Sequence, residues 1–336
     1  MNFILTVDTE ADNQWDHGRG LTVENLKYIP RLQDLCNKYH VKPTYLVTSE
    51  VCEDSFAREI FCDYIENDEA ELGAHLHAWT TPPFLDKDGC RYNDKYHAFA
   101  SELPYDLVAN KMRYLTDQIS TAFGKRPTSF RSGRYGFNEN IAKILLSNGY
   151  LVDSSVTPYI NWSEKKGIPG QNGGPDFMNK RPSPYTYNFN GASLLEIPVT
   201  ILPTRFPLTR DNKFTGFYFN KVNNNFFLKS IRSILFKYQP LWLRPYPWMT
   251  LALLDELVME AVHAKLPYLV MIFHSSELMA DCSIYRTDKE SIEKLYELLE
   301  GFFMLLNYNG ITSISLTEAA KKFEVVTGKV LSYKYI

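Results

Sequence analysis

The 336-residue sequence predicts a single α/β domain whose parallel strands close into a barrel. Short apolar runs alternate with longer segments of helical periodicity, which is typical of a parallel sheet covered by helices. Roughly seven such strand–helix units occur, and this number favours a barrel over an open sheet. Polar residues recur at the carboxyl ends of the predicted strands, where the chemistry of such barrels gathers. The length accommodates one domain over residues 1–336 with insertions.

The elements of the first half follow from periodicity and from helix-end signals. Residues 3–7 (FILTV) form the first strand, and the next helix has its N-cap at Thr22. Apolar residues recur at helical spacing in this helix: Leu26, Ile29, Leu32, Leu35 and Tyr39. The further elements up to residue 153 are the strands 43–47, 71–75, 129–130 and 150–153 and the helices 54–67, 105–123 and 138–147, the last closed by Gly149.

Two insertions interrupt the alternation in the second half. Residues 161–193 are rich in Gly, Pro, Asn and Ser, which predicts a long loop or small hairpins over the barrel mouth. Residues 205–249 are aromatic and basic, and within 205–244 eight Lys and Arg residues stand against one Asp, a net charge of +7. The latter segment predicts contact with phosphates or an anionic membrane surface, or else a helix that packs on the barrel. The regular elements around the insertions are the strands 196–199, 268–273 and 311–314 and the helices 250–264 and 288–307.

Composition restricts the class and the location of the protein. A net charge of −3 gives no general signal for nucleic-acid binding. The opening run MNFILTV reaches an acid at Asp8, which is too short for a signal sequence or a membrane span. The five cysteines are odd in number and contain no CxxC pair, as expected for reduced thiols. We therefore expect a cytoplasmic protein.

An acidic cluster follows the first predicted strand. Asp8, Glu10 and Asp12 alternate, so they share one face if the chain stays extended. Three carboxylates at one place repel one another, and a cation or an arginine is expected beside them. Solvated carboxylates at a strand end are the alternative.

A histidine pair follows the predicted strand 71–75. His75 and His77 are two residues apart and share one face of an extended segment. Neutral imidazoles with a carboxylate oxygen are the ligands of catalytic zinc and related divalent ions. The pattern predicts a metal site in which Asp8, Glu10 or Asp12 supplies the acidic ligand.

Three further strand ends carry polar groups. Arg131 in SFRSGRYGF is placed to pair with a catalytic carboxylate and keep it ionised, and backbone N–H groups near Tyr135 are placed to face an oxyanion. His274 follows an apolar strand, where a general acid would stand. Asp153 is expected to bind the other ring nitrogen of His274, and Glu277 to contact the substrate or support the site. The remaining histidines are interpreted as structural or surface residues: His17, His40, His97 and His263.

The order of these motifs resembles the polysaccharide deacetylases, the NodB-homology group that includes carbohydrate esterase family 4. The resemblance covers about residues 3–316. It implies a distorted (β/α)7 barrel that holds a divalent metal, commonly zinc, through an Asp-His-His set. It also implies that Asp8 is the base, that Arg131 and Tyr135 belong to the arginine motif, and that His274 is the acid.

The sequence departs from the family pattern at two places. Thr9 stands where the second aspartate is expected, and Glu10 is its stand-in on the same strand face as Asp8. The histidines are two apart instead of four, with Trp79 at the fourth position. The variant motifs DTE, HLHxW, FRSGRYG and FHSSEL look like those of the subgroup that accompanies bacterial surface-glycan biosynthesis, such as O-antigen or capsule.

The resemblance implies hydrolysis of an N-acetyl group on a sugar, with acetate as one product. The expected substrate is an N-acetylated glycan or a nucleotide- or lipid-linked sugar. Two alternatives remain open. The same site suits another non-peptide amide, as in allantoinase-like relatives, and the Thr9 departure fits a glycan-binding protein without turnover.

Overall fold

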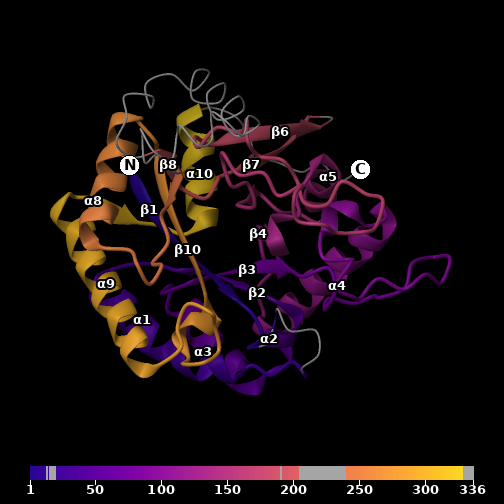
Figure 1. Ribbon diagram of the computed structural model, residues 1–336, viewed down its shortest axis with the longest axis horizontal. Helices are drawn as coiled ribbons and strands as arrows, with labels where there is room; N and C mark the ends of the chain where they lie inside the picture. Colours follow the sequence, from indigo (N-terminus) through magenta and orange to yellow (C-terminus); the bar gives the residue numbers. More distant parts are fainter. Residues whose placement is uncertain (13, 15–19, 190, 204–239, 328–336) are drawn as a thin grey trace.

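The computed structural model describes residues 1–12, 14, 20–189, 191–203 and 240–327. Within these residues the centre is a nine-stranded sheet in the order β10-β1-β2-β3-β4-β5-β7-β6, with β11 also paired to β1 (Figure 1). All pairs in this sheet are parallel except the β6–β7 hairpin. The strands are β1 (Asn2–Thr9), β2 (Thr44–Val47), β3 (Glu71–Leu76), β4 (Ser129–Ser132), β5 (Val152–Asp153), β6 (Tyr185–Phe189), β7 (Ala192–Glu196), β10 (Tyr268–His274) and β11 (Thr312–Ser313).

The sheet curls, and the chain that leaves β7 returns to the opposite edge. The backbone N–H of Ile197 donates to Asp153 at 2.9 Å, and that of Thr200 donates to the carbonyl of Val270 in β10 at 3.2 Å. A small antiparallel pair of β8 (Ile201–Pro203) and β9 (Pro240–Trp242) follows at this seam. The predicted parallel α/β architecture is therefore confirmed.

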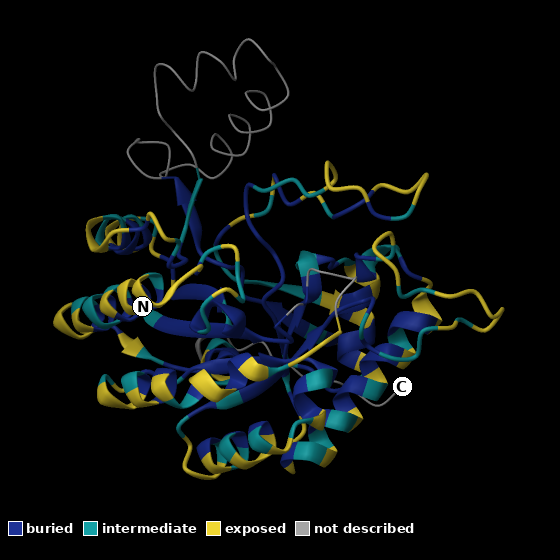
Figure 2. Cartoon of the chain, turned by 60° about the horizontal axis from the view of Figure 1, so that its bottom comes forward, coloured by how far each residue is buried: buried dark blue, intermediate teal, exposed yellow. Residues whose placement is uncertain are grey.

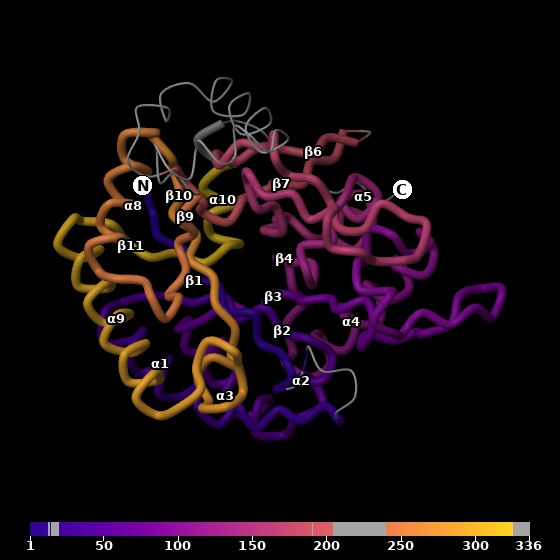
Figure 3. The backbone as a smooth tube through the Cα atoms, in the orientation of Figure 1, coloured from indigo at the N-terminus to yellow at the C-terminus, as the bar shows by residue number. Residues whose placement is uncertain are grey.

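Helices cover the outer face of the curled sheet (Figures 1 and 3). They are α1 (Ile29–Lys38), α2 (Ser49–Glu53), α3 (Ser55–Glu66), α4 (Tyr105–Phe123), α5 (Glu139–Ser147), α8 (Leu251–His263), α9 (Lys289–Tyr308) and α10 (Leu316–Thr327). Side-chain oxygens of Asn138, Thr250 and Asp288 accept backbone N–H groups at the starts of α5, α8 and α9. The helices bury one side and expose the other (Figure 2). No helix among the described residues is long and apolar enough to cross a membrane.

Strand β1 shows how the core positions the site. Phe3, Leu5 and Val7 belong to the large apolar cluster shared with the covering helices. Ile4 belongs to a second cluster with residues of β2, β5 and β10. Because side chains alternate along a strand, the even-numbered residues face the barrel interior, and the next inward residue at the strand end is Asp8.

Several sequence-based boundaries are wrong for local reasons. Thr22 does not cap the first helix: the chain enters through a 3-10 turn, η1 (Glu24–Tyr28), whose first N–H groups are accepted by Asp12 at 2.8 Å. The strand expected at 196–199 is β7 instead, and Pro198, which lacks an N–H, follows its end.

The two predicted insertions have different outcomes. Residues 161–184 are irregular, with a bridge between Asn161 and Asp176, and β6 and β7 follow them. Residues 204–239 lie outside the described part of the chain, so phosphate or membrane contact by 205–244 stays a prediction.

Candidate active site

Polar side chains meet at the carboxyl ends of the parallel strands. Asp8 of β1 is in register with His274 of β10, and His75 of β3 is in register with Arg131 of β4. All four residues are buried or nearly so. The structure thus brings together groups that the sequence separates by more than 260 residues.

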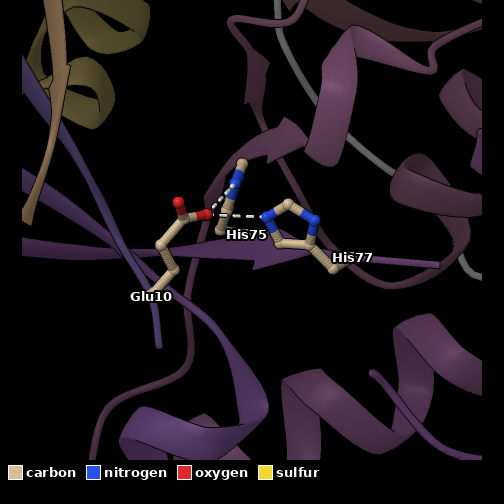
Figure 4. Close-up of side chains that lie close together, drawn as sticks. All are labelled: Glu10, His75 and His77. Carbon is tan, nitrogen blue, oxygen red and sulfur yellow. Dashed lines mark hydrogen bonds and ion pairs between the residues drawn. The ribbon is translucent and has the colours of Figure 1, made fainter. Parts of the chain in front are cut away.

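Glu10, His75 and His77 form a cluster whose ligand atoms all lie within 4.8 Å of one another (Figure 4). Oε2 of Glu10 is 2.7 Å from Nε2 of His77 and 3.6 Å from Nε2 of His75. In the close-up both imidazoles turn toward the same carboxylate oxygen. We call these residues the Glu–His–His cluster.

The surroundings orient the two histidines of this cluster. Nδ1 of His75 lies 3.0 Å from the carbonyl oxygen of Arg131, to which it donates, so Nε2 carries the lone pair that faces Glu10. The ring of His77 packs edge-on against Trp79 at 4.4 Å. Gly133 also lies against this ring, and a Cβ atom there would come within 2.7 Å of Nδ1 of His77. Only glycine leaves room for this ring.

The cluster fits a divalent cation. Oε1 of Glu10 is fully buried and has no hydrogen-bond partner among the described residues, although a buried carboxylate oxygen ordinarily has one. Burial opposes ionisation of Glu10, but His274, His75 and His77 outweigh it and keep its pKa well below the ordinary range. A carboxylate with two neutral imidazoles is a set of ligands that divalent transition metals prefer.

The three acidic candidates have different surroundings. Glu10 belongs to the Glu–His–His cluster, and Asp8 pairs with Arg131. Both oxygens of Asp12 are occupied by Thr22, Glu24 and Asn25. The expectation that all three share a face fails at Asp12, because β1 ends at Thr9.

Asp8 and Arg131 form a buried ion pair. Nη1 of Arg131 lies 2.7 Å from Oδ1 of Asp8 and 2.9 Å from the hydroxyl of Thr6. The remaining guanidinium donors reach Ser154, through its carbonyl at 2.8 Å and its hydroxyl at 3.1 Å. Burial alone would raise the pKa of Asp8. The positive charge of Arg131 and the nearby His75 and His274 lower it by more, so the pKa of Asp8 is below its ordinary value.

His274 faces Asp8 across neighbouring strands, with its Nε2 3.9 Å from Oδ2 of Asp8. The acid next to Nδ1 of His274 is Glu277, at 3.4 Å, in the 3-10 turn η5 (Ser275–Leu278). The predicted pairing of His274 with Asp153 is wrong. Both oxygens of Asp153 accept from Ser155, at 2.6 and 3.0 Å, because β5 turns directly after Asp153.

Asp153 instead lies beside Glu196, and burial raises the pKa of both carboxyls. The two carboxyls are in register on β5 and β7, and both are fully buried. Burial and the neighbouring charge of Asp153 raise the pKa of Glu196 well above its ordinary value. A proton between two buried carboxyls relieves their repulsion, so we interpret this pair as structural.

A cleft of about 700 Å³ opens above these groups. Asp8, His75 and His274 line it, whereas the side chains of Glu10 and His77 lie beneath its surface with no exposure. Its walls carry aromatic and cationic side chains: Arg134, Tyr135, Trp162, Lys165, Trp242, Arg244, Tyr246 and Tyr285.

Tyr135 lies where the arginine motif bends over the cleft. Its ring stacks on Trp162 with centroids 5.2 Å apart and leans on Trp242 at 5.9 Å. Arg134 and Tyr135 have backbone φ of +52° and +60°, a conformation that costs free energy for residues with a side chain. Such strain at the rim of a cleft is common at functional sites.

Two groups beside His274 have roles that sequence reasoning missed. Glu277 was expected only as a substrate contact or supporting group, and Arg244 only as one of eight basic residues in the segment 205–244. In the structure their side chains form an ion pair at 2.6 Å. The three-residue spacing of His274 and Glu277 was a signal, but nothing in the sequence pointed Arg244 inward.

No protein-family model and no curated protein matches the sequence. Among solved structures, one described as a putative polysaccharide deacetylase from Mycobacterium smegmatis is similar with a TM-score of 0.52 and 13% identity, over 98% of this chain and 93% of that one. An allantoinase, PuuE, scores 0.48 at 13% identity over 98% and 91% of the two chains. A 4-alpha-glucanotransferase from Thermococcus litoralis scores 0.49 at 11% identity over 96% and 38%. The latter two scores are too low to add to the first. The curled parallel sheet and the first similarity together identify the fold as the distorted (β/α)7 barrel of the polysaccharide-deacetylase type.

Proposed function

We propose that the protein is a metal-dependent hydrolase that removes the acetyl group from an N-acetylated sugar. The observation that carries this proposal is the convergence, at one cleft, of the Glu–His–His cluster, the Asp8–Arg131 ion pair and His274. Each group taken alone has a structural interpretation. Together they supply a cation site, an ionised carboxylate and an imidazole within a few ångströms of one another.

The residues that would hold the ion are Glu10, His75 and His77, and zinc is the ion best matched to this set. The chemistry that such an ion supplies when bound is Lewis acidity, which acidifies water and polarises a carbonyl group. Thr9 stands at the position of the second family aspartate, and its hydroxyl donates a hydrogen bond to the carbonyl oxygen of Val7 at 3.0 Å. We propose that Glu10, which belongs to the Glu–His–His cluster, replaces the missing aspartate, and this weakens the case for a protein without turnover.

The proton transfers follow from the positions of Asp8 and His274. Asp8, held ionised by Arg131, takes a proton from the attacking water. As the C–N bond breaks, Asp8 gives this proton to the leaving nitrogen and is ionised again. His274, whose Nε2 is 3.9 Å from Oδ2 of Asp8, donates a hydrogen bond from Nε2 to the reacting amide. Water and the amide have become acetic acid and an amine, and backbone N–H groups near Tyr135 are proposed to stabilise the oxyanion.

The walls of the cleft support a sugar as the substrate. Trp162, Trp242 and Tyr135 present rings with centroids 5.2–6.4 Å apart, and aromatic rings pack against the apolar faces of sugars. The volume of about 700 Å³ accommodates more than the acetamide group. We propose an N-acetylated glycan, or its nucleotide- or lipid-linked precursor from surface-glycan biosynthesis.

The test combines metal analysis with product detection. His75→Ala and His77→Ala are compared with the wild type for bound metal and for acetate release from N-acetylhexosamine oligosaccharides and nucleotide-linked N-acetylhexosamines. We expect each variant to lose its metal, with acetate release falling to the background rate. His263→Ala, at an exposed position at the end of α8, is the matched control and should change neither. Unchanged activity in either site variant would refute the metal assignment, and release of ammonia in place of acetate would indicate a different amide.

A further inference from the structure

Arg244 contacts His274 in a way that the roles above do not use. Its Nη2 lies 3.0 Å from Nδ1 of His274 and 2.6 Å from Oε1 of Glu277. Arg244 is only 4% exposed and Glu277 is fully buried. Burial costs a guanidinium free energy, but Glu277 outweighs this and raises the pKa of Arg244. The pair is therefore charged, and one guanidinium nitrogen bridges the carboxylate and the imidazole.

The backbone fixes this arrangement. Leu243, beside Arg244, accepts the N–H of Ile272, which is two residues before His274 in β10, at 3.3 Å. The guanidinium lies 4.7 Å and 5.1 Å from the ring centroids of Tyr285 and Tyr246. Glu277 also accepts the backbone N–H of His274 at 3.1 Å. These contacts hold Arg244, Glu277 and His274 together at the end of β10.

The contact determines which ring nitrogen of His274 carries the proton. A guanidinium can only donate hydrogen bonds, so Nδ1 of His274 must accept, and the proton of the neutral ring is on Nε2. Nε2 is the nitrogen that faces Asp8, and His274 lines the cleft. Without Arg244, Oε1 of Glu277 at 3.4 Å would attract the proton to Nδ1 and leave Nε2 without one.

We infer that Arg244 and Glu277 are a positioning pair that holds His274 in the Nε2–H form, with its proton directed into the cleft. Glu277 orients and neutralises Arg244, and Arg244 selects the tautomer. The consequence for activity rests on the proposed function, because a hydrogen bond from His274 to the reacting amide needs a proton on Nε2. The tautomer itself does not depend on that function and can be measured without substrate.

The direct test is long-range ¹⁵N–¹H correlation NMR of the histidine rings in the full-length protein. Spectra are recorded at about pH 8.5, where an ordinary histidine is neutral, and His274→Gln identifies the signal. We expect Nε2–H in the wild type and Nδ1–H in Arg244→Met. Arg31→Met removes an exposed arginine that pairs with Glu293 and should leave the signal unchanged. An Nδ1–H ring in the wild type, or an unchanged tautomer in Arg244→Met, would overturn the inference.

A second variant covers a failure of Arg244→Met to fold, since that change leaves Glu277 buried without its partner. Arg244→Met with Glu277→Met buries no unpaired charge, and the ring should then lose its preference for Nε2–H. A preference that persists in the double variant contradicts the inference.

Turnover gives a separate readout. In Arg244→Met we expect kcat to fall about tenfold to a hundredfold, as for the loss of a hydrogen bond to the reacting group, while KM stays within about twofold. Arg244→Lys keeps a donor near Nδ1 and should recover part of the loss. A rise in KM with unchanged kcat would mean that Arg244 only binds substrate. A wild type that releases no acetate from any sugar refutes the proposed function, and the NMR result still decides the inference.

Discussion

The two sides of the cleft are built in different ways. On one side the Glu–His–His cluster and the Asp8–Arg131 pair lie on or directly after β1, β3 and β4, so strands of the parallel sheet supply every partner. On the other side His274 stands on β10, and one of its partners, Arg244, comes from a segment that pairs with the seam of the barrel. On the first side, the positions of the functional residues follow from the alternation of side chains along each strand. The arrangement of the His274 side depends on where the chain between β8 and β9 comes back to the barrel and places Arg244. For this reason the roles on the first side can be predicted from sequence, whereas the role of Arg244 cannot.

The largest expected effects separate the two acids of the first side. Glu10→Gln should lose most of the bound metal, because it removes the charge of the buried carboxylate that faces both histidines. Asp8→Asn should keep the metal and lower kcat by about 10²- to 10⁴-fold, the range for loss of a general base. Metal content and acetate release, measured on the same samples, check both. If Asp8→Asn lost the metal and Glu10→Gln kept it, Asp8 would be the metal ligand and Glu10 the general base, which contradicts our assignment.

A smaller effect is expected at Gly133, which lies against His77 of the ion site. In Gly133→Ala the new Cβ would meet Nδ1 of His77 at 2.7 Å and the carbonyl of Leu76 at 2.8 Å, so the ring must shift. We expect the affinity for zinc to fall about 10- to 100-fold, as for loss of support behind a ligand. Competition with a chelating dye measures it. Gly20→Ala, where a Cβ would meet nothing within 4 Å, is the control; equal affinities in the two variants would contradict this account of His77.

The smallest effect concerns Glu196, at the end of β7. Its pKa is raised in the folded state, so the proton it holds stabilises the fold below its unfolded pKa, and this contribution is lost as the pH rises through the folded pKa. Glu196→Gln should therefore gain stability relative to the wild type between pH 5 and pH 8, by about 1 kcal/mol. Urea unfolding at both pH values tests this. Glu66→Gln, at an exposed position, should show no such gain, and a pH-independent difference for Glu196→Gln would argue against the shared proton.

Sequence reasoning predicted the part of the fold that periodicity controls. The helix at 105–123 and the strand ends at Asp8, His75, Arg131 and His274 are found as expected, because alternation and helical spacing depend on local residues. It failed where the partner is set by tertiary structure. Asp153 was assigned to His274 because both follow strands, but its carboxyl is drawn to Ser155 and Glu196. Asp12 was placed in the acidic cluster, but the chain had already left the strand.

The register of Asp8 with His274 has a consequence for how the protein becomes active during synthesis. β1 is the first strand to be made, yet its partners β10 and β11 come from the last quarter of the chain. One edge of β1 therefore has no strand to pair with until almost the whole polypeptide has been synthesised. Pairing between strands that are so far apart in the sequence is slow. Asp8 and His274 meet only at that final step. A growing chain thus holds an incomplete site, and its chemistry begins only when the barrel has closed.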